Sequence, residues 1–184
     1  MEKNVRGQIQ TGELSPGDIH DNLLDSFDRY QKVERYWSSK SGTWTLLNEG
    51  YEEDWDTVKK KDRIRIFREI LEKGEGSIFA AFDDGKFIGF AVLLNEKFGS
   101  VKQYVQMKYL HVSNGYRHCG TGKRLFRLCV ERAKELGAQK IYISANDSED
   151  TQRFYLNLGC ADAEEINAEC AEAEPYDRQM EYPV

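Results

Sequence analysis

The sequence predicts a single α/β domain of the α+β type, in which helices flank a central mixed, mostly antiparallel β-sheet. Two patterns in the 184 residues point to this fold. Residues 77–94 contain two apolar runs joined by Asp83-Asp84-Gly85-Lys86, and Asp and Gly tolerate the positive φ that a tight hairpin demands. Residues 104–145 follow the order strand, Gly-rich turn, helix and strand, which makes the two strands parallel neighbours. Hydrophobic residues make up 40% of the chain, as is typical of a folded globular domain.

The amino-terminal part is expected to supply a strand and a helix. Residues 5–11 alternate weakly between polar and apolar side chains, which predicts a first strand. Ser15, followed by proline and glycine, is a typical helix start. Apolar residues with helical spacing come next: Ile19, Leu23, Leu24, Phe27 and Tyr30. We therefore predict that Ser15 caps an amphipathic helix.

Aromatic and β-branched residues dominate the next segment, 33–56. They predict a hairpin insertion around Ser41-Gly42, with Tyr36-Trp37 facing Trp44-Thr45. The stretch from Trp55 to Lys73 has the apolar spacing of a second amphipathic helix, and a glycine follows it.

Two further elements are expected after residue 139. KIYISA at 140–145 is the second strand of the strand–turn–helix–strand unit. Ser148 is expected to cap a short helix, because two acidic residues follow it and favour the positive end of the helix dipole. Gly159 supplies the left-handed exit from that helix.

Composition also excludes several classes of protein. The amino terminus lacks an apolar signal segment and no apolar run is long enough to span a bilayer, so we expect a cytoplasmic protein without membrane contact. The net charge of −6 argues against nucleic-acid binding, which needs a basic surface. The acidity is local, since residues 161–184 hold eight acidic residues and one basic residue.

Neither the cysteines nor the histidines have metal-ligand spacing. The four cysteines form no CxxC pair and are expected to be reduced. His20, His111 and His118 show neither HxxxH nor HExxH spacing, so we predict no metal.

The most informative segment is Arg117-His118-Cys119-Gly120-Thr121-Gly122, which lies between a strand end and a helix start. A loop in this place exposes several backbone N–H groups beside the positive end of the helix dipole, and together they bind an anion. A Walker A loop does not fit, because Arg117 stands where its first glycine would be and Arg124 where its Ser or Thr would be. The dinucleotide fingerprint GxGxxG fails at Leu125, its third glycine position.

Residues Arg117–Gly122 and Ser148–Gly159, with strands and helices in this order, resemble the GNAT superfamily of N-acetyltransferases. The loop matches the family's RxxGxG motif, and Phe154, Tyr155 and Gly159 match its FYxxxG motif. The likeness is good over residues 77–160. The whole chain also looks like a bacterial-type branch with an E-D-W segment, here Glu53-Asp54-Trp55, and an acidic end closing in E-Y.

The resemblance implies one GNAT-type domain over residues 1–184, a cofactor-binding core at 77–160 and acetyl-coenzyme A (acetyl-CoA) as cofactor. The pyrophosphate would bind the loop, and backbone amides near Leu110 to Val112 would hold the thioester carbonyl. In many members an Asn contacts the cofactor arm; here Ser148 has that place and Asn146 lies two residues earlier. The implied cofactor-binding residues are Leu110, His111, Val112, Arg117, His118, Cys119, Gly120, Thr121, Gly122, Lys123, Ser148 and Phe154.

The resemblance places Tyr155 near the thioester sulfur. Because the leaving thiolate has a pKa of about 8.5, a phenol within hydrogen-bond range can protonate it, so Tyr155 is the predicted catalytic acid. An attacking amine must lose a proton, and the candidates to take it are Glu49, Glu53, Asp54, His111 or water. We interpret Cys119 as a small residue that is tolerated beside a phosphate and not as a nucleophile, because no general base stands at a recognisable spacing from it in the sequence.

The acidic segment 161–184 would supply the last strands of the sheet, which border the acceptor pocket in the family. We therefore predict acetyl transfer to a primary amine of a small cationic acceptor by direct transfer in a ternary complex. The alternatives are a catalytically silent acetyl-CoA-binding module and a protein-lysine acetyltransferase. The sequence leaves a homodimer open.

Overall fold

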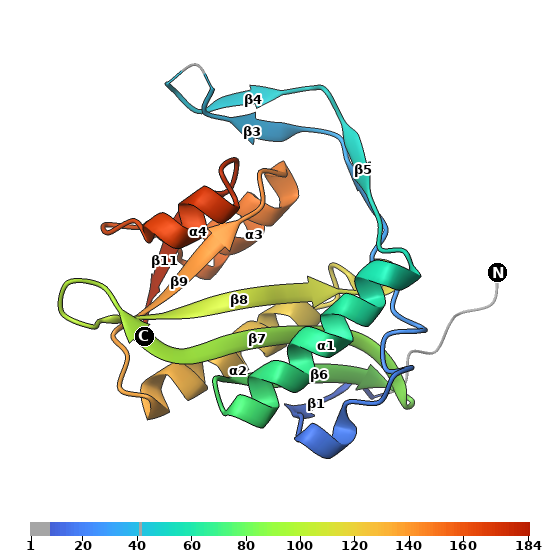
Figure 1. Ribbon diagram of the computed structural model, residues 1–184. Helices are drawn as coiled ribbons and strands as arrows, with labels where there is room; N and C mark the ends of the chain where they lie inside the picture. The colour runs from blue at the N-terminus through green and yellow to red at the C-terminus, as the bar shows by residue number, and fades with distance from the viewer. Residues whose placement is uncertain (1–7, 41) are drawn as a thin grey trace.

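The computed structural model describes residues 8–40 and 42–184, and its core is one seven-stranded sheet (Figure 1). In spatial order the strands are β1 (Gln10–Glu13), β6 (Gly76–Asp83), β7 (Lys86–Phe98), β8 (Tyr104–Val112), β9 (Lys140–Ala145), β11 (Arg178–Pro183) and β10 (Ala161–Asp162). Only β8 and β9 pair in parallel; the other neighbours are antiparallel. The predicted mixed, mostly antiparallel sheet is therefore confirmed.

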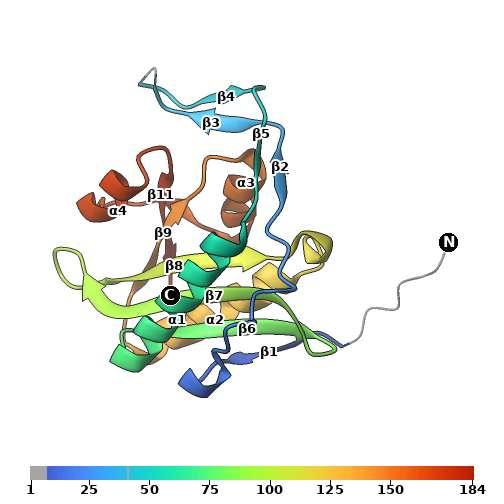
Figure 2. The same cartoon turned by 45° about the vertical axis from the view of Figure 1, so that its right-hand side comes forward.

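Helices cover both faces of this sheet (Figure 1, Figure 2). Helix α1 (Thr57–Lys73) packs on one face, where Phe67 meets Phe90 of β7 at 4.9 Å between ring centroids. Helix α2 (Thr121–Glu135) lies on the other face, with Leu125 and Cys129 fully buried. The shorter elements are α3 (Glu149–Leu158), α4 (Ala168–Ala173) and the 3-10 helices η1 (Pro16–Asp18) and η2 (Asn114–Tyr116).

Local signals set the bounds of several elements. The β6–β7 hairpin turns at Asp84 and Gly85, with φ of 48° and 76°, as predicted for this pair of residues. The expected helix 55–73 is confirmed with a start at Thr57, because the Asp56 side chain accepts from the Lys59 N–H; Gly74 ends it with φ 65°.

The predicted helix after Ser15 is wrong. Ser15 does begin η1 with a capping box to Asp18, but the chain then continues through successive turns bonded from residue i to i−3, such as Phe27 to Leu24. Burial of Leu24 and Phe27 against the α1 face accounts for the apolar spacing without a helix. The first strand is β1 at Gln10–Glu13 rather than 5–11, and residues 5–7 of that prediction lie outside the described residues.

The segment 31–53 forms a ribbon of two strand pairs, which confirms the hairpin but corrects its register. Strand β2 (Gln31–Val33) pairs with β5 (Tyr51–Glu53), and β3 (Tyr36–Ser38) pairs with β4 (Thr45–Leu47). Trp37 lies opposite Leu46, not Trp44, because the loop between β3 and β4 is longer than a tight turn. The ribbon arches over α3, to which backbone bonds from Trp37 to Asp147 and from Glu149 to Arg35 hold it (Figure 1).

The two parallel strands separate after a short paired stretch. Tyr104–Gln106 of β8 pairs with Lys140–Tyr142 of β9, and beyond this stretch the two strands are not paired. At the same place β8 has a bulge, since Met107 lies opposite Leu93 and Tyr109 opposite Val92, which leaves Lys108 unpaired. The sheet therefore opens between β8 and β9 on the side toward the Gly-rich loop.

Candidate active site

The amino terminus of α2 presents a row of free backbone donors. Gly120 is the N-cap residue and no side chain caps the helix. Among the described residues, no acceptor contacts the N–H groups of Gly120, Thr121, Gly122 and Lys123. These donors and the helix dipole make a site for an anion such as a diphosphate.

The two glycines of the loop have different structural roles. Gly120 has φ 83°, and nothing lies within 4 Å of a Cβ built on it, so it supplies a left-handed turn that faces open space. Gly122 has helical geometry, and its Cβ would lie 3.3 Å from the Phe154 ring and 3.6 Å from Leu110. Gly122 therefore lets α3 pack close to α2, and only Gly120 borders the space where an anion approaches.

The loop side chains turn inward or stay at the surface. The Arg117 guanidinium donates to the carbonyls of Val112 and Arg29, both at 3.1 Å, and burial lowers its pKa. It thus joins the end of β8 to the segment before β2. His118, with φ 59°, Cys119 and Lys123 are exposed, and the Cys119 Sγ contacts the Arg117 carbonyl at 3.0 Å. Thr121 is 1% exposed, and its Oγ1 has no partner in the described part of the chain.

The β8 residues Leu110, His111 and Val112 pair with β7 on one side only. Because a strand points alternate backbone groups to opposite sides, part of this backbone faces the β8–β9 opening. The Leu110 and Val112 side chains pack toward α2, whereas the His111 ring lies on the α1 face, 5.0 Å from Trp55 and 5.3 Å from Phe90.

Tyr155 lies on the buried face of α3. Its ring packs 5.1 Å from that of Phe154 and 6.4 Å from that of Phe126. Burial raises the pKa of this phenol well above its ordinary value, with a smaller contribution from nearby thiols, so the hydroxyl keeps its proton.

The turn between β9 and α3 holds Asn146 and Ser148. As predicted, Ser148 caps α3: its Oγ accepts from the Thr151 N–H at 3.1 Å and donates to the Thr151 Oγ1 at 2.8 Å. Ser148 is buried, with its hydroxyl engaged in the cap. The Asn146 Oδ1 accepts from the Ser148 N–H at 3.0 Å and from the Tyr51 hydroxyl at 3.3 Å.

The proton acceptors named from the sequence have different surroundings. Glu49 and Asp54 are exposed, and the Asp54 carboxylate accepts from the Trp55 N–H at 2.7 Å. Glu53 forms an ion pair with Arg29 at 2.7 Å. His111 is neutral, because burial and the charges of three arginines, Arg29, Arg63 and Arg117, hold its pKa well below the usual value.

Sequence analysis did not single out the carboxylates of Asp147 and Asp177. Burial raises the pKa of Asp147, whose carboxylate accepts from the Tyr51 hydroxyl. Burial also raises the pKa of Asp177 to about 7, with further contributions from Glu174, Asp147 and Glu53. Asp177 is one of eight acidic residues in its segment, and no local pattern distinguishes it from the other seven.

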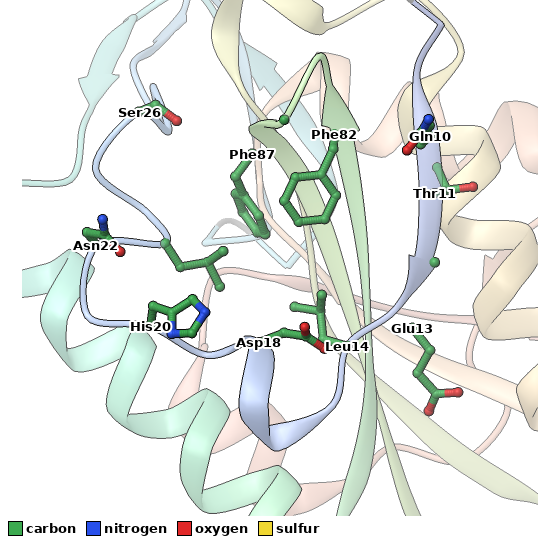
Figure 3. A pocket seen from close by; sticks show the side chains of 13 residues that line it. Gln10, Thr11, Glu13, Leu14, Asp18, His20, Asn22, Ser26, Phe82 and Phe87 are labelled. Carbon is green, nitrogen blue, oxygen red and sulfur yellow. The ribbon is translucent and has the colours of Figure 1, made fainter.

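A cavity of about 370 Å³ lies beneath the ribbon 31–53, and Tyr51, Asp147 and Tyr176 are among the residues that line it. A larger cavity of about 590 Å³ lies at the β1 edge of the sheet, where Phe82 and Phe87 face His20 (Figure 3). None of the residues that line the larger cavity lies on β8, β9 or α2, so we do not assign the chemistry to it.

Two general features of the described residues also bear on the site. No group of three or more His, Cys, Asp or Glu side chains is arranged to hold a metal ion in residues 8–40 and 42–184. Within those ranges, no helix combines the length and apolar character needed to cross a membrane.

Comparison with known proteins identifies the family. The model of the acetyltransferase (GNAT) family matches residues 41–160. Similar solved structures include a nourseothricin acetyltransferase (TM-score 0.68, 15% identity, covering 95% of this chain and 98% of that one). A putative streptothricin acetyltransferase from Bacillus anthracis in complex with acetyl-CoA gives TM-score 0.70 and 19% identity over 96% and 99% of the chains. The PaiA N-acetyltransferase from Thermoplasma acidophilum in complex with CoA gives 0.61 and 17% over 96% and 99%.

No curated protein matches the sequence significantly. The family match covers more than half of the chain, so the chain belongs to the acetyltransferase (GNAT) family, and the predicted resemblance is confirmed. It is an acetyltransferase that uses acetyl-CoA as its cosubstrate.

Proposed function

We propose that this member of the acetyltransferase (GNAT) family moves the acetyl group to a primary amine of a small cationic acceptor, by direct transfer in a ternary complex. The observation that carries the proposal is the set of free N–H groups at Gly120–Lys123, which lies at the end of the β8–β9 opening. Strand β9 borders this opening and leads to α3, which carries Tyr155. Its last residue, Ala145, lies opposite Arg178, the neighbour of Asp177.

The residues present fit acetyl-CoA. The N–H groups of Gly120–Lys123 would hold its diphosphate, with Lys123 at the surface beside them. The unpaired edge of Leu110–Val112 would bind the cofactor arm and polarise the thioester carbonyl through backbone N–H groups. When bound, the cofactor supplies an acetyl thioester that an amine attacks.

Tyr155 would donate the proton that the departing sulfur takes. Its raised pKa keeps the phenol protonated at neutral pH, and its burial keeps water from competing for the same hydrogen bond. Phe154, which packs on Gly122, fixes the orientation of the helix that carries Tyr155.

Three partly buried carboxylates, Glu53, Asp147 and Asp177, support a cationic acceptor. Glu53 raises the pKa of Asp147, and both raise the pKa of Asp177, so the three lie close together and present negative charge to a cation. Solved structures similar to this chain include nourseothricin, putative streptothricin and aminoglycoside acetyltransferases.

A panel of amines incubated with acetyl-CoA tests the proposal through release of free thiol. The panel contains nourseothricin, aminoglycosides, polyamines, amino acids and lysine peptides. We expect release with at least one small polycation and none above background hydrolysis with neutral amino acids. Release with lysine peptides alone would favour protein-lysine acetylation. No release with any amine, together with retained CoA binding, would favour a silent cofactor-binding module.

A further inference from the structure

Asp177 lies beside the end of β9 that borders the β8–β9 opening. It directly precedes β11, whose first residue, Arg178, lies opposite Ala145 at the end of β9. Its N–H donates to the Glu174 carbonyl at 3.1 Å, and its carbonyl accepts from the Gln179 side chain at 3.2 Å. The backbone is thus held on both sides while the carboxylate remains available.

The Asp177 carboxylate has no hydrogen bond or ion pair with any residue that the structure describes. The adjacent base, Arg178, is engaged by both oxygens of Asp162, at 2.6 and 3.0 Å. The charges that raise the pKa of Asp177 all come from acidic residues: Glu174 after α4, Asp147 before α3 and Glu53 on β5. The Lys40 ammonium group lies 4.9 Å from the centroid of the adjacent Tyr176 ring. A partly buried carboxylate among like charges is unfavourable unless a cation joins it.

The other two partly buried carboxylates, Glu53 and Asp147, already have partners. Arg29 neutralises Glu53, and the Tyr51 hydroxyl donates to Asp147. Asp177 is therefore the carboxylate of the group that is left to interact with a ligand. The charge of Asp177 also acts on the Tyr155 phenol, which places the two side chains near the same space.

An independent observation on α3 also points to a ligand. Gln152, 1% exposed, lies one turn before Tyr155 on the buried face of the helix. Its Oε1 accepts from Arg178, the neighbour of Asp177, at 3.5 Å, whereas its Nε2 has no partner in the described residues. A buried amide donor without a partner is costly, so an oxygen atom from outside the chain is expected to complete this site.

We propose that Asp177 takes the proton from the ammonium group of the acceptor, while Asp147 attracts the cationic acceptor to it. This role rests on the proposed function. The Asp177 carboxylate accepts one proton from the ammonium group, and the free amine then attacks the acetyl carbonyl carbon. As the C–N bond forms and the C–S bond breaks, the sulfur takes the Tyr155 proton. The second proton lost by the nitrogen restores the Tyr155 phenol, and Asp177 releases its proton to solvent.

The groups named from the sequence are less suited to this step. His111 lies among three guanidinium groups that oppose its protonation, and the Glu53 carboxylate is already engaged in an ion pair with Arg29. Asp177 titrates near neutral pH, where a general base is both partly ionised and strong enough to take a proton.

The pH dependence of kcat/KM for the Asp177→Asn variant tests this role. The substrate is whichever of nourseothricin and spermidine the wild type acetylates. The wild type should lose kcat/KM below a pH near 7. Asp177→Asn should lack this acid limb and have kcat/KM about 10²-fold lower at pH 8, with unchanged CoA affinity. Glu172→Gln, which removes an exposed carboxylate from the same segment, is the matched control and should behave as wild type.

A second variant tests the same role while leaving the Asp177 side chain in place. Glu174→Gln removes a like charge that raises the pKa of Asp177, so it should move the acid limb to lower pH. An acid limb that persists unshifted in Asp177→Asn would overturn the role of Asp177 and leave acetyl transfer standing. Carboxyl 13C NMR of the full chain should also show one aspartate that titrates near pH 7 and disappears in Asp177→Asn; its absence would overturn the proposal without any assay of activity.

Discussion

Replacing Gly120 by alanine should affect both the stability of the fold, through backbone strain, and anion binding, and the two effects can be measured separately. At φ 83° an alanine is strained by about 1–2 kcal/mol relative to glycine, and nothing in the structure clashes with the new Cβ. For a chain of this size each kcal/mol lowers Tm by about 2–4 °C, so Gly120→Ala should unfold about 2–8 °C below wild type.

The same substitution should affect CoA binding more strongly than stability. The new Cβ points into the open space that borders the free N–H groups of Gly120–Lys123. A hydrogen bond to a charged group is worth about 1.5–3 kcal/mol, so displacing the diphosphate from two of these donors costs at least about 3 kcal/mol. This corresponds to a loss of CoA affinity of about 10²-fold.

Isothermal titration with CoA measures this loss, and the chain offers a matched control. Gly42 also has φ 83° and open space around its Cβ, but it lies in the loop of the β3–β4 hairpin, far along the chain from α2. Gly42→Ala should show a similar drop in Tm and wild-type CoA affinity. If both variants bind CoA as tightly as wild type, the loop does not hold the diphosphate.

Three further substitutions test other parts of the site. Tyr155→Phe should lower kcat about 10²-fold with CoA affinity unchanged; an unchanged kcat would remove the phenol from the mechanism. Ser148→Ala should lower Tm by about 2–4 °C through loss of a helix cap of about 1 kcal/mol, without weakening CoA binding, since a weakened Kd would reveal a cofactor contact. His111→Gln concerns pH: the folded chain resists protonation of His111, whereas the unfolded chain binds that proton below about pH 6.5. Wild-type stability should therefore fall as the pH decreases through 6.5, and His111→Gln should lose about 1 kcal/mol less between pH 7 and 5.5; parallel melting profiles would contradict this.

Elements with local signals could be predicted from the sequence. The turn at Asp84-Gly85 needs residues that accept positive φ, and the side chains of Asp56 and Ser148 cap helices by accepting from backbone N–H groups three residues later. The segment after Ser15 could not be predicted, because its conformation depends on contacts of Leu24 and Phe27 with α1 and β7, more than thirty residues away. Helical spacing alone does not distinguish these turns from a helix.

The site also combines features that could be predicted from the sequence with features that could not. Free donors at the start of α2 follow from backbone geometry, so Arg117–Gly122 predicted them without knowledge of the tertiary fold. Gly122 packs against Phe154, and Asp177 lies close to other carboxylates. Both arrangements depend on how α3 and β11 meet the rest of the sheet. Such contacts leave no periodic pattern in the sequence.

In the proposed binding mode, the charge layout of the site favours backbone groups over side-chain cations as ligands of the diphosphate. The one arginine in the loop, Arg117, directs its guanidinium to the carbonyls of Val112 and Arg29, away from the free donors. Helix-terminal N–H groups carry only partial charges, and their field falls off within about one turn. They can therefore hold a diphosphate at one end of the β8–β9 opening without repelling a cationic acceptor drawn to Asp177 and Asp147 at the other. In the proposed arrangement the cofactor and the acceptor are attracted to different groups of the site, so neither competes for the place of the other.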